Sequence, residues 1–136
     1  MSIEYKLFGR PKTPEELMDK AERKGLDSVD VVLGDFDSIG GRNFSYHCVV
    51  ELRAGKTRLR YSQHKYNRSG NLAEVVIEKA IVQQNSLQDA IEAAKILQDH
   101  GFQSSINGKS IEEAQEALEQ HKEAIQAKRQ ELAPYL

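Results

Sequence analysis

The sequence lacks most of the features that mark secreted and membrane proteins. It has no tryptophan and only one cysteine, Cys48, so no disulfide can form within the chain. It has no apolar run of about 18 residues, the length that a membrane-spanning helix needs. The first residues, MSIEYKLFGRPK, lack the apolar segment of a secretory signal peptide. We therefore expect a soluble, cytoplasmic protein with no membrane partner.

Motifs of the common enzyme classes are also missing. The sequence contains no glycine-rich phosphate loop of the nucleotide-binding kinds and no Gly-x-Ser-x-Gly nucleophile turn. Its four histidines lie in separate segments, without the spacing of metal ligands. The sequence leaves open whether the protein is an enzyme. It predicts no cofactor apart from the divalent cation considered below.

The composition is typical of one globular domain. The 136 residues are 39% hydrophobic and 29% charged, which suits a single domain over residues 1–136 with its own apolar core. The charge is unevenly spread along the chain. Between Arg42 and Lys79 there are eight lysines and arginines but three glutamates, whereas the whole chain has a net charge of −2. Positive charge is therefore concentrated in one segment.

The basic segment has the pattern of a β-hairpin. Residues 44–53 alternate between apolar and polar side chains, which is typical of a strand with one buried face. Ala54–Gly55 supplies a two-residue loop. Across this loop the predicted core pairs are Leu52 with Thr57, Val50 with Leu59, and Cys48 with Tyr61. The opposite, polar face then carries Arg53, Lys56, Arg58, Arg60 and His64. Cys48 is interpreted as a buried packing residue and not as a nucleophile.

Local patterns predict the remaining elements. Thr13 and Ser110 each precede a glutamate by three residues, the spacing of a helix capping box. Strands are predicted at 2–8, 28–37 and 72–82, with a short additional strand at 102–106, and helices at 14–24, 87–100 and 111–132. A flexible connection is expected at 38–43 and a loose tail at 133–136. The predicted fold class is α+β: a mainly antiparallel sheet of four or five strands, two helices packed on one face, and a long C-terminal helix beside them.

The polar face of the hairpin is the candidate ligand site. Arg58 and Arg60, two residues apart on one strand, point the same way and suit bidentate contact with phosphate. The candidate ligand-binding residues are Arg53, Lys56, Arg58, Arg60, His64, Lys65 and Arg68. The leading hypothesis is a small binding protein whose partner is a nucleotide, another phosphate-containing ligand or a nucleic acid. The alternative is a solvated face whose arginines pair with neighbouring glutamates.

Asp35 and Asp37 are the candidate metal ligands. Two carboxylates spaced by two residues at the end of a predicted strand can hold a divalent cation, although a solvated turn has the same pattern. With a phosphorylated substrate on the arginines, they would form a small metal-assisted enzyme. Another alternative is a structural or interaction protein. In that case the sheet edge or the last helix forms a homodimer or binds a larger assembly.

Overall fold

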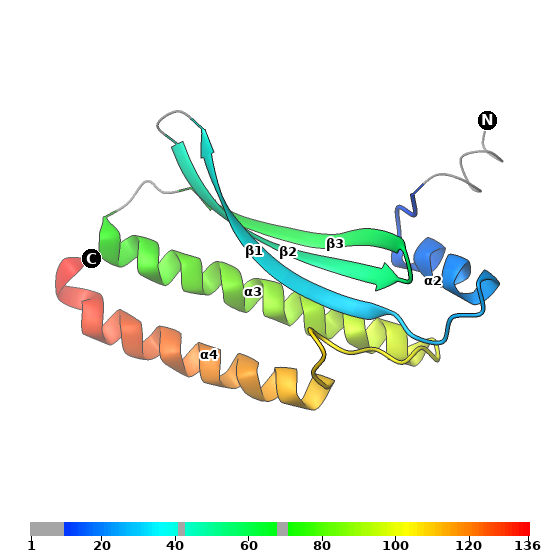
Figure 1. The fold of residues 1–136 in the computed structure, drawn as a ribbon. Helices are drawn as coiled ribbons and strands as arrows, with labels where there is room; N and C mark the ends of the chain where they lie inside the picture. Colours follow the sequence, from blue (N-terminus) through cyan, green and yellow to red (C-terminus); the bar gives the residue numbers. More distant parts are fainter. Residues whose placement is uncertain (1–9, 41–42, 68–70) are drawn as a thin grey trace.

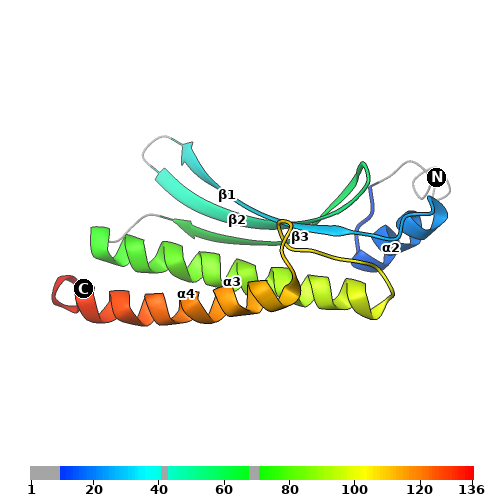
Figure 2. The same ribbon diagram turned by 60° about the horizontal axis from the view of Figure 1, so that its bottom comes forward.

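The protein folds into a curved antiparallel sheet with two long helices layered beneath it (Figure 1). Residues 10–40, 43–67 and 71–136 are described by a computed structural model. The elements in chain order are α2 (Pro14–Arg23), β1 (Asp30–Gly40), β2 (Asn43–Ala54), β3 (Thr57–Asn67), α3 (Leu72–Asp99), α4 (Ile111–Leu132) and a short 3₁₀ helix, η1 (Ala133–Tyr135). α3 lies between the sheet and α4 (Figures 1 and 2). The fold class is α+β as predicted, with three strands in the described residues and not four or five.

The β2–β3 hairpin is present, but its turn and register differ from those predicted. The loop is Gly55–Lys56, and Gly55 has a φ of 60°, the positive value that the first position of a type II′ turn requires. Leu52 therefore pairs with Leu59 and not with Thr57, the predicted partner two positions earlier. A shift of two residues keeps each side chain on its face, so Val50 and Leu52 are buried as expected.

A β-bulge reverses the faces of the second half of β3. Glu51 pairs with Arg60, but the neighbouring Val50 pairs with Ser62. One extra residue on a strand inverts the alternation of side chains beyond it. The sequence pattern places His64 on the open, polar face of the sheet. The structure corrects this, because the bulge turns His64 toward the helices.

Residues 72–82 form the first turns of a helix and not the strand that their alternating pattern predicts. α3 begins after Asn71, whose Oδ1 accepts a hydrogen bond from the backbone N–H of Glu74 at 2.8 Å. The buried residues of its first turns are Ala73, Val75 and Ile77. α3 packs against both the sheet and α4, and a helix buried on two sides can show the period-two pattern of a strand over a short stretch. The predicted helix 87–100 is the second half of this longer helix.

The apolar core lies between the sheet and the helices. It combines buried side chains from all three strands with those of α2, α3 and the first half of α4. The larger fully buried hydrophobic residues are Leu17, Val29, Val31, Val50, Leu52 and Leu97. α2 and α4 occupy their predicted spans to within a residue, and α4 runs antiparallel along α3 (Figure 2). Burial of this shared core fixes α2 against the β2–β3 end of the sheet.

The other predicted strands have different outcomes. The strand expected at 28–37 is β1, which continues to Gly40 through the segment expected to be a flexible connection. The segment 102–106 forms two isolated parallel bridges, one to Val31 near the start of β1 and one to Ser28 just before that strand. The predicted strand 2–8 lies outside the described residues. Within the part of the chain that the structure describes, no helix is long and apolar enough to cross a membrane.

Candidate functional site

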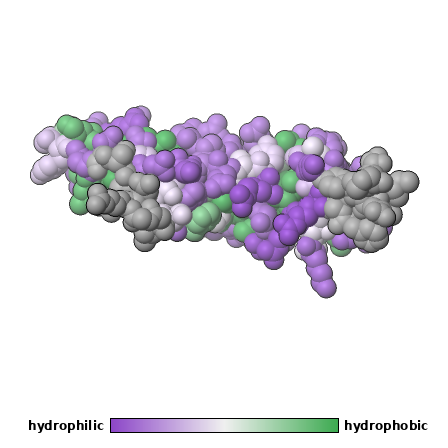
Figure 3. Space-filling view, turned by 90° about the horizontal axis from the view of Figure 1, so that it is seen from above, coloured by the Kyte–Doolittle hydropathy of each residue, from purple (hydrophilic) through white to green (hydrophobic). Residues whose placement is uncertain are grey.

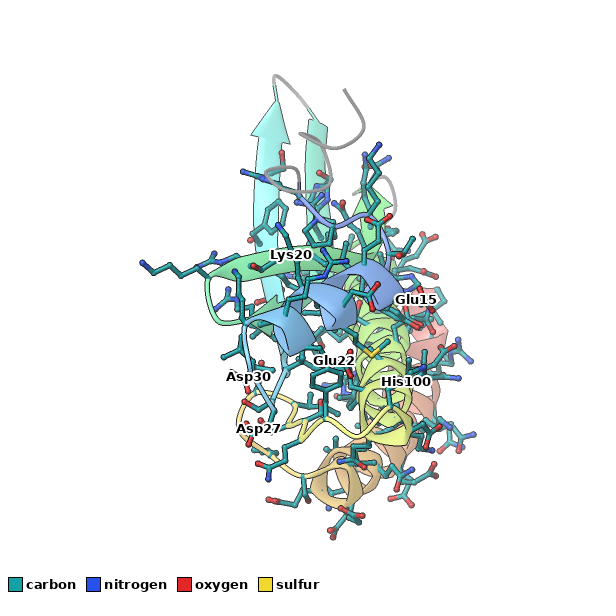
Figure 4. The ribbon with its side chains drawn as sticks, turned by 90° about the vertical axis from the view of Figure 1, so that its right-hand side faces the viewer. Glu15, Lys20, Glu22, Asp27, Asp30 and His100 are labelled. Carbon is teal, nitrogen blue, oxygen red and sulfur yellow. The ribbon has the colours of Figure 1, made fainter. Side chains whose placement is uncertain are left out.

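A groove of about 830 Å³ opens where the β2–β3 turn meets α2. The cationic side chains that line it come from three segments: Arg10 before α2, Lys20 on α2, and Lys56, Arg58 and Arg60 on the hairpin. Of the described residues that line the groove, only Glu51 is acidic. Figure 4 looks onto this end of the molecule and shows Lys20 on the side of α2 turned toward β3, whereas Glu22 lies on the opposite side of that helix. The fold therefore gathers positive charge from distant parts of the sequence.

The sheet holds the groove arginines on the face away from the helices. Arg58 and Arg60 are two residues apart on β3, so both project from this open face. Glu51 on β2 is already engaged there, because Arg53 Nε lies 2.6 Å from Glu51 Oε1 and Arg58 Nε lies 3.9 Å from the same oxygen. The Arg58 side chain is nevertheless 63% exposed. An exposed ion pair of this kind contributes at most about 1 kcal/mol, so a ligand can compete for the guanidinium.

Most of the predicted ligand residues lie on one surface. Those at or beside the groove are Arg53, Lys56, Arg58 and Arg60. Lys65 is exposed on the same face, further along β3 and opposite His47. Arg68 lies outside the described residues. The residues that the sequence assigns to the polar face therefore lie together as far as the bulge, and their role in ligand binding stays a prediction.

His64 does not belong to this surface. Its Nε2 lies 2.6 Å from Asp89 Oδ2 on α3, so the pair joins the sheet to the helix layer. Arg58 and Arg60 project from the other side of the same sheet. We therefore leave His64 out of the candidate ligand site.

A chain of hydrogen bonds leads from the groove across the open face to an aromatic pair. Arg60 Nη1 donates to Gln63 Oε1 at 3.0 Å, and Gln63 Nε2 lies 2.7 Å from His47 Nδ1. An amide nitrogen only donates, so His47 accepts at Nδ1, carries its hydrogen at Nε2 and donates to Ser45 Oγ at 2.8 Å. Phe36 lies flat against the fixed imidazole, with ring centres 4.7 Å apart and planes 3° from parallel.

Asp35 and Asp37 lie on the helix-facing side of β1, opposite Cys48 and Tyr46. The Tyr46 hydroxyl donates to Asp35 Oδ2 at 2.7 Å and accepts from Gln83 Nε2 at 2.8 Å. Among the residues that the structure describes, no group of three His, Cys, Asp or Glu side chains could hold a metal ion. The metal site therefore stays a prediction. It would lie on the other face of the sheet from the groove arginines.

A smaller hollow of about 310 Å³ is lined in part by Asp35, Tyr46, Cys48 and Gln83. Burial raises the pKa of Tyr46 well above its usual value, and its hydrogen bonds with Cys48 and Asp35 raise this pKa further. Burial also raises the pKa of the Cys48 thiol, which is 2% exposed. Both groups therefore stay neutral near pH 7, and a neutral buried thiol is a poor nucleophile. This agrees with the prediction that Cys48 is a packing residue.

Several residues of the groove and of the open face were not identified from the sequence. Arg10 and Lys20 reach the groove only because α2 docks beside β3. Phe36 meets His47 only through the β1–β2 register, which pairs these two residues. The basic string Arg10-Pro11-Lys12 is a weak signal in the sequence, but nothing local connects it with the hairpin.

Comparison with known proteins gives this chain no relative. No family model matches it, and no curated protein or solved structure matches it significantly.

Proposed function

We propose that this protein binds phosphate-bearing anions in the basic groove. The observation that carries the proposal is the convergence of five cationic side chains, from three separate segments, on one hollow of about 830 Å³. Ligand sites commonly have volumes of roughly 300–1,000 Å³. A guanidinium contacts phosphate through two parallel hydrogen bonds, and a lysine adds a mobile point charge. The arginines on β3 supply the first kind of contact, and Lys20 and Lys56 supply the second.

The pairing of charges supports an anion site over a merely solvated face. In a solvated face each arginine would have a neighbouring carboxylate, but here Arg53 and Arg58 share Glu51. Arg60 donates to the neutral amide of Gln63. Figure 3 looks onto the open face and shows that its visible surface is mostly hydrophilic. On the described part of the hairpin, the three guanidinium groups of Arg53, Arg58 and Arg60 thus share one carboxylate, and an excess of positive charge raises the local concentration of anions.

The residues that line the groove also limit what it recognises. None of its described lining residues is aromatic, so the groove itself offers no surface on which a base could stack. Its chemistry suits the phosphate groups that nucleotides, polyphosphates and nucleic acids share. The proposed function is therefore phosphate recognition.

Removing both β3 arginines tests this function. We expect Arg58→Ala with Arg60→Ala to weaken the binding of sodium tripolyphosphate by about 10-fold or more, because each charge-assisted hydrogen bond contributes about 1.5–3 kcal/mol. Isothermal titration calorimetry at low salt measures the affinity. Both side chains are exposed, so the melting temperature is expected to stay close to that of the wild type.

The matched control removes two positive charges elsewhere. Lys95→Ala with Arg129→Ala changes exposed residues of α3 and α4, and we expect it to bind tripolyphosphate nearly as well as the wild type. A groove variant that binds like this control would rule out the groove as the site. A wild-type protein that binds no tripolyphosphate would rule out the function.

A protein interface is the second candidate function, because the molecule exposes a separate apolar hollow. This hollow, of about 450 Å³, lies where the start of α3 meets the end of the chain. Its apolar and aromatic lining residues are Leu72, Ala73, Val76, Leu132 and Tyr135. An exposed patch of this kind suits a protein partner or a second copy of the chain. Sedimentation velocity distinguishes these, since a strict monomer at high concentration argues against the homodimer.

A further inference from the structure

The open face has an ordered arrangement of side chains from the turn to the far end of the strands. Side chains of one face occupy rows across the sheet, and each row lies two residues from the next. From the turn outward the rows are Asp30–Arg53–Arg58, Val32–Glu51–Arg60, Gly34–Val49–Gln63 and Phe36–His47–Lys65. Positive charge thus follows β3, whereas the single aromatic pair lies across β1 and β2. The third row contains Gly34 and has no bulky side chain on β1.

The aromatic pair is built to present one ring to solvent. His47 is 8% exposed and its two ring nitrogens are held by Gln63 and Ser45, so the imidazole cannot turn. Phe36 stacks on this ring and is 48% exposed. Exposure of an apolar ring to water is unfavourable in free energy. A ligand stacked on Phe36 would cover the ring and remove this cost. The hydrogen-bonded chain from Arg60 through Gln63 connects this stack with the groove.

Resting on the proposed function, we propose that the open face binds single-stranded nucleic acid. Arg58, Arg60 and Lys65 contact phosphates along the bound strand, and Phe36 stacks on a base. Aromatic stacking combined with a basic track is the chemistry by which proteins hold single strands. The rows from Arg53 to His47 span six residue steps along β2, or about 20 Å, which is long enough for several nucleotides.

The stack favours a single strand over a duplex and over a polyphosphate. Bases in a duplex already stack on one another, so they cannot reach a ring on the protein surface without being flipped out. A polyphosphate has no base and gains nothing from Phe36. Asp30 and Glu51 also lie on this face. Glu51 is paired with Arg53, and Asp30 lies on β1, away from the basic track on β3.

Replacement of Phe36 tests the inference. We expect Phe36→Ala to weaken the binding of a fluorescein-labelled oligothymidine of about 12 nucleotides by about 10-fold in fluorescence anisotropy. Binding of tripolyphosphate is expected to be unchanged, because it uses only the groove. Tyr135→Ala is the matched control: it also removes an exposed aromatic ring, and it is expected to leave both affinities unchanged.

Phe36→Trp gives a second, direct measurement. The natural chain has no tryptophan, so fluorescence from the introduced indole reports on this one position. We expect oligothymidine to bind this variant at least as tightly as the wild type and to quench its fluorescence, whereas tripolyphosphate does not quench it. Quenching requires the base to contact the ring, so a merely structural contribution of Phe36 would not produce it.

The outcomes separate the two proposals. If Phe36→Ala and the wild type bind oligothymidine equally, or if no quenching occurs, the stacking inference is wrong while phosphate recognition stands. The same holds if a duplex binds as tightly as the single strand, or if tripolyphosphate binds and oligothymidine does not. If the wild type binds neither probe at low salt, the proposed function and this inference both fail.

Discussion

Leu97→Ala is expected to lower the free energy of unfolding by about 2–5 kcal/mol. Leu97 is 0% exposed and belongs to the core cluster that joins α3 to the sheet and α2. Truncation removes apolar contacts and leaves a cavity, because the close-packed neighbours relax only partly. This cost is a large share of the total free energy of unfolding, which is roughly 5–15 kcal/mol for a typical domain. Urea unfolding followed by circular dichroism measures it.

Leu72→Ala is the matched control, because it makes the same substitution in the same helix. Leu72 is 70% exposed, and alanine is the stronger helix former. We expect a change within about 0.5 kcal/mol. Equal costs at the two positions would contradict the packing of α3 between the sheet and α4.

Glu78→Pro is expected to lower the free energy of unfolding by about 3 kcal/mol or more. Position 78 lies inside α3, where proline removes a backbone hydrogen bond to the carbonyl four residues earlier and clashes with the preceding turn. The same urea unfolding experiment measures the loss. This position falls in the segment whose sequence pattern predicts a strand, so the result reports on the conformation of that segment.

Glu78→Ala separates the backbone effect from the loss of a side chain. In a helix the alanine variant is expected to be as stable as the wild type, to within about 0.5 kcal/mol, because alanine has the highest helix propensity. In a strand alanine is disfavoured. A stable proline variant together with a destabilised alanine variant would show that 72–82 is not helical.

Elements with their own capping chemistry could be predicted from the sequence. Ser110 Oγ accepts from the backbone N–H of Glu113, whose carboxylate accepts from the N–H of Ser110. Thr13 Oγ1 accepts from the backbone N–H of Glu16 in the same way. These contacts span three residues, so a short sequence window contains all the information. The α2 and α4 predictions were confirmed for this reason.

Features that depend on distant contacts could not be predicted. The segment 72–82 alternates like a strand because its helix is buried by two different partners. The bulge beside Val50 has no glycine or other local signal. It turns His64 toward Asp89 and away from the open face of the sheet. Patterns of period two predict which side chains share a face only while the ladder is unbroken.

The candidate site was accessible to sequence reasoning in part. Arg58 and Arg60 were identified because two residues on one strand necessarily share a face. Arg10 and Lys20 join them through the docking of α2 on the sheet, which no local pattern encodes. The stack of Phe36 on His47 needs the β1–β2 register, and the sequence did not indicate that 30–40 pairs with the hairpin.

The salt dependence of oligothymidine binding to the wild-type protein tests the central claim most directly. If Arg58, Arg60 and Lys65 contact phosphates, alone or together with Lys56, three to four counterions are released, and each contributes about −0.7 to the slope of log affinity against log salt. Raising the salt from about 50 to 200 mM is then expected to weaken binding roughly 20- to 50-fold. Binding that does not change with salt, or no binding of oligothymidine or tripolyphosphate at the lower salt, would contradict the account.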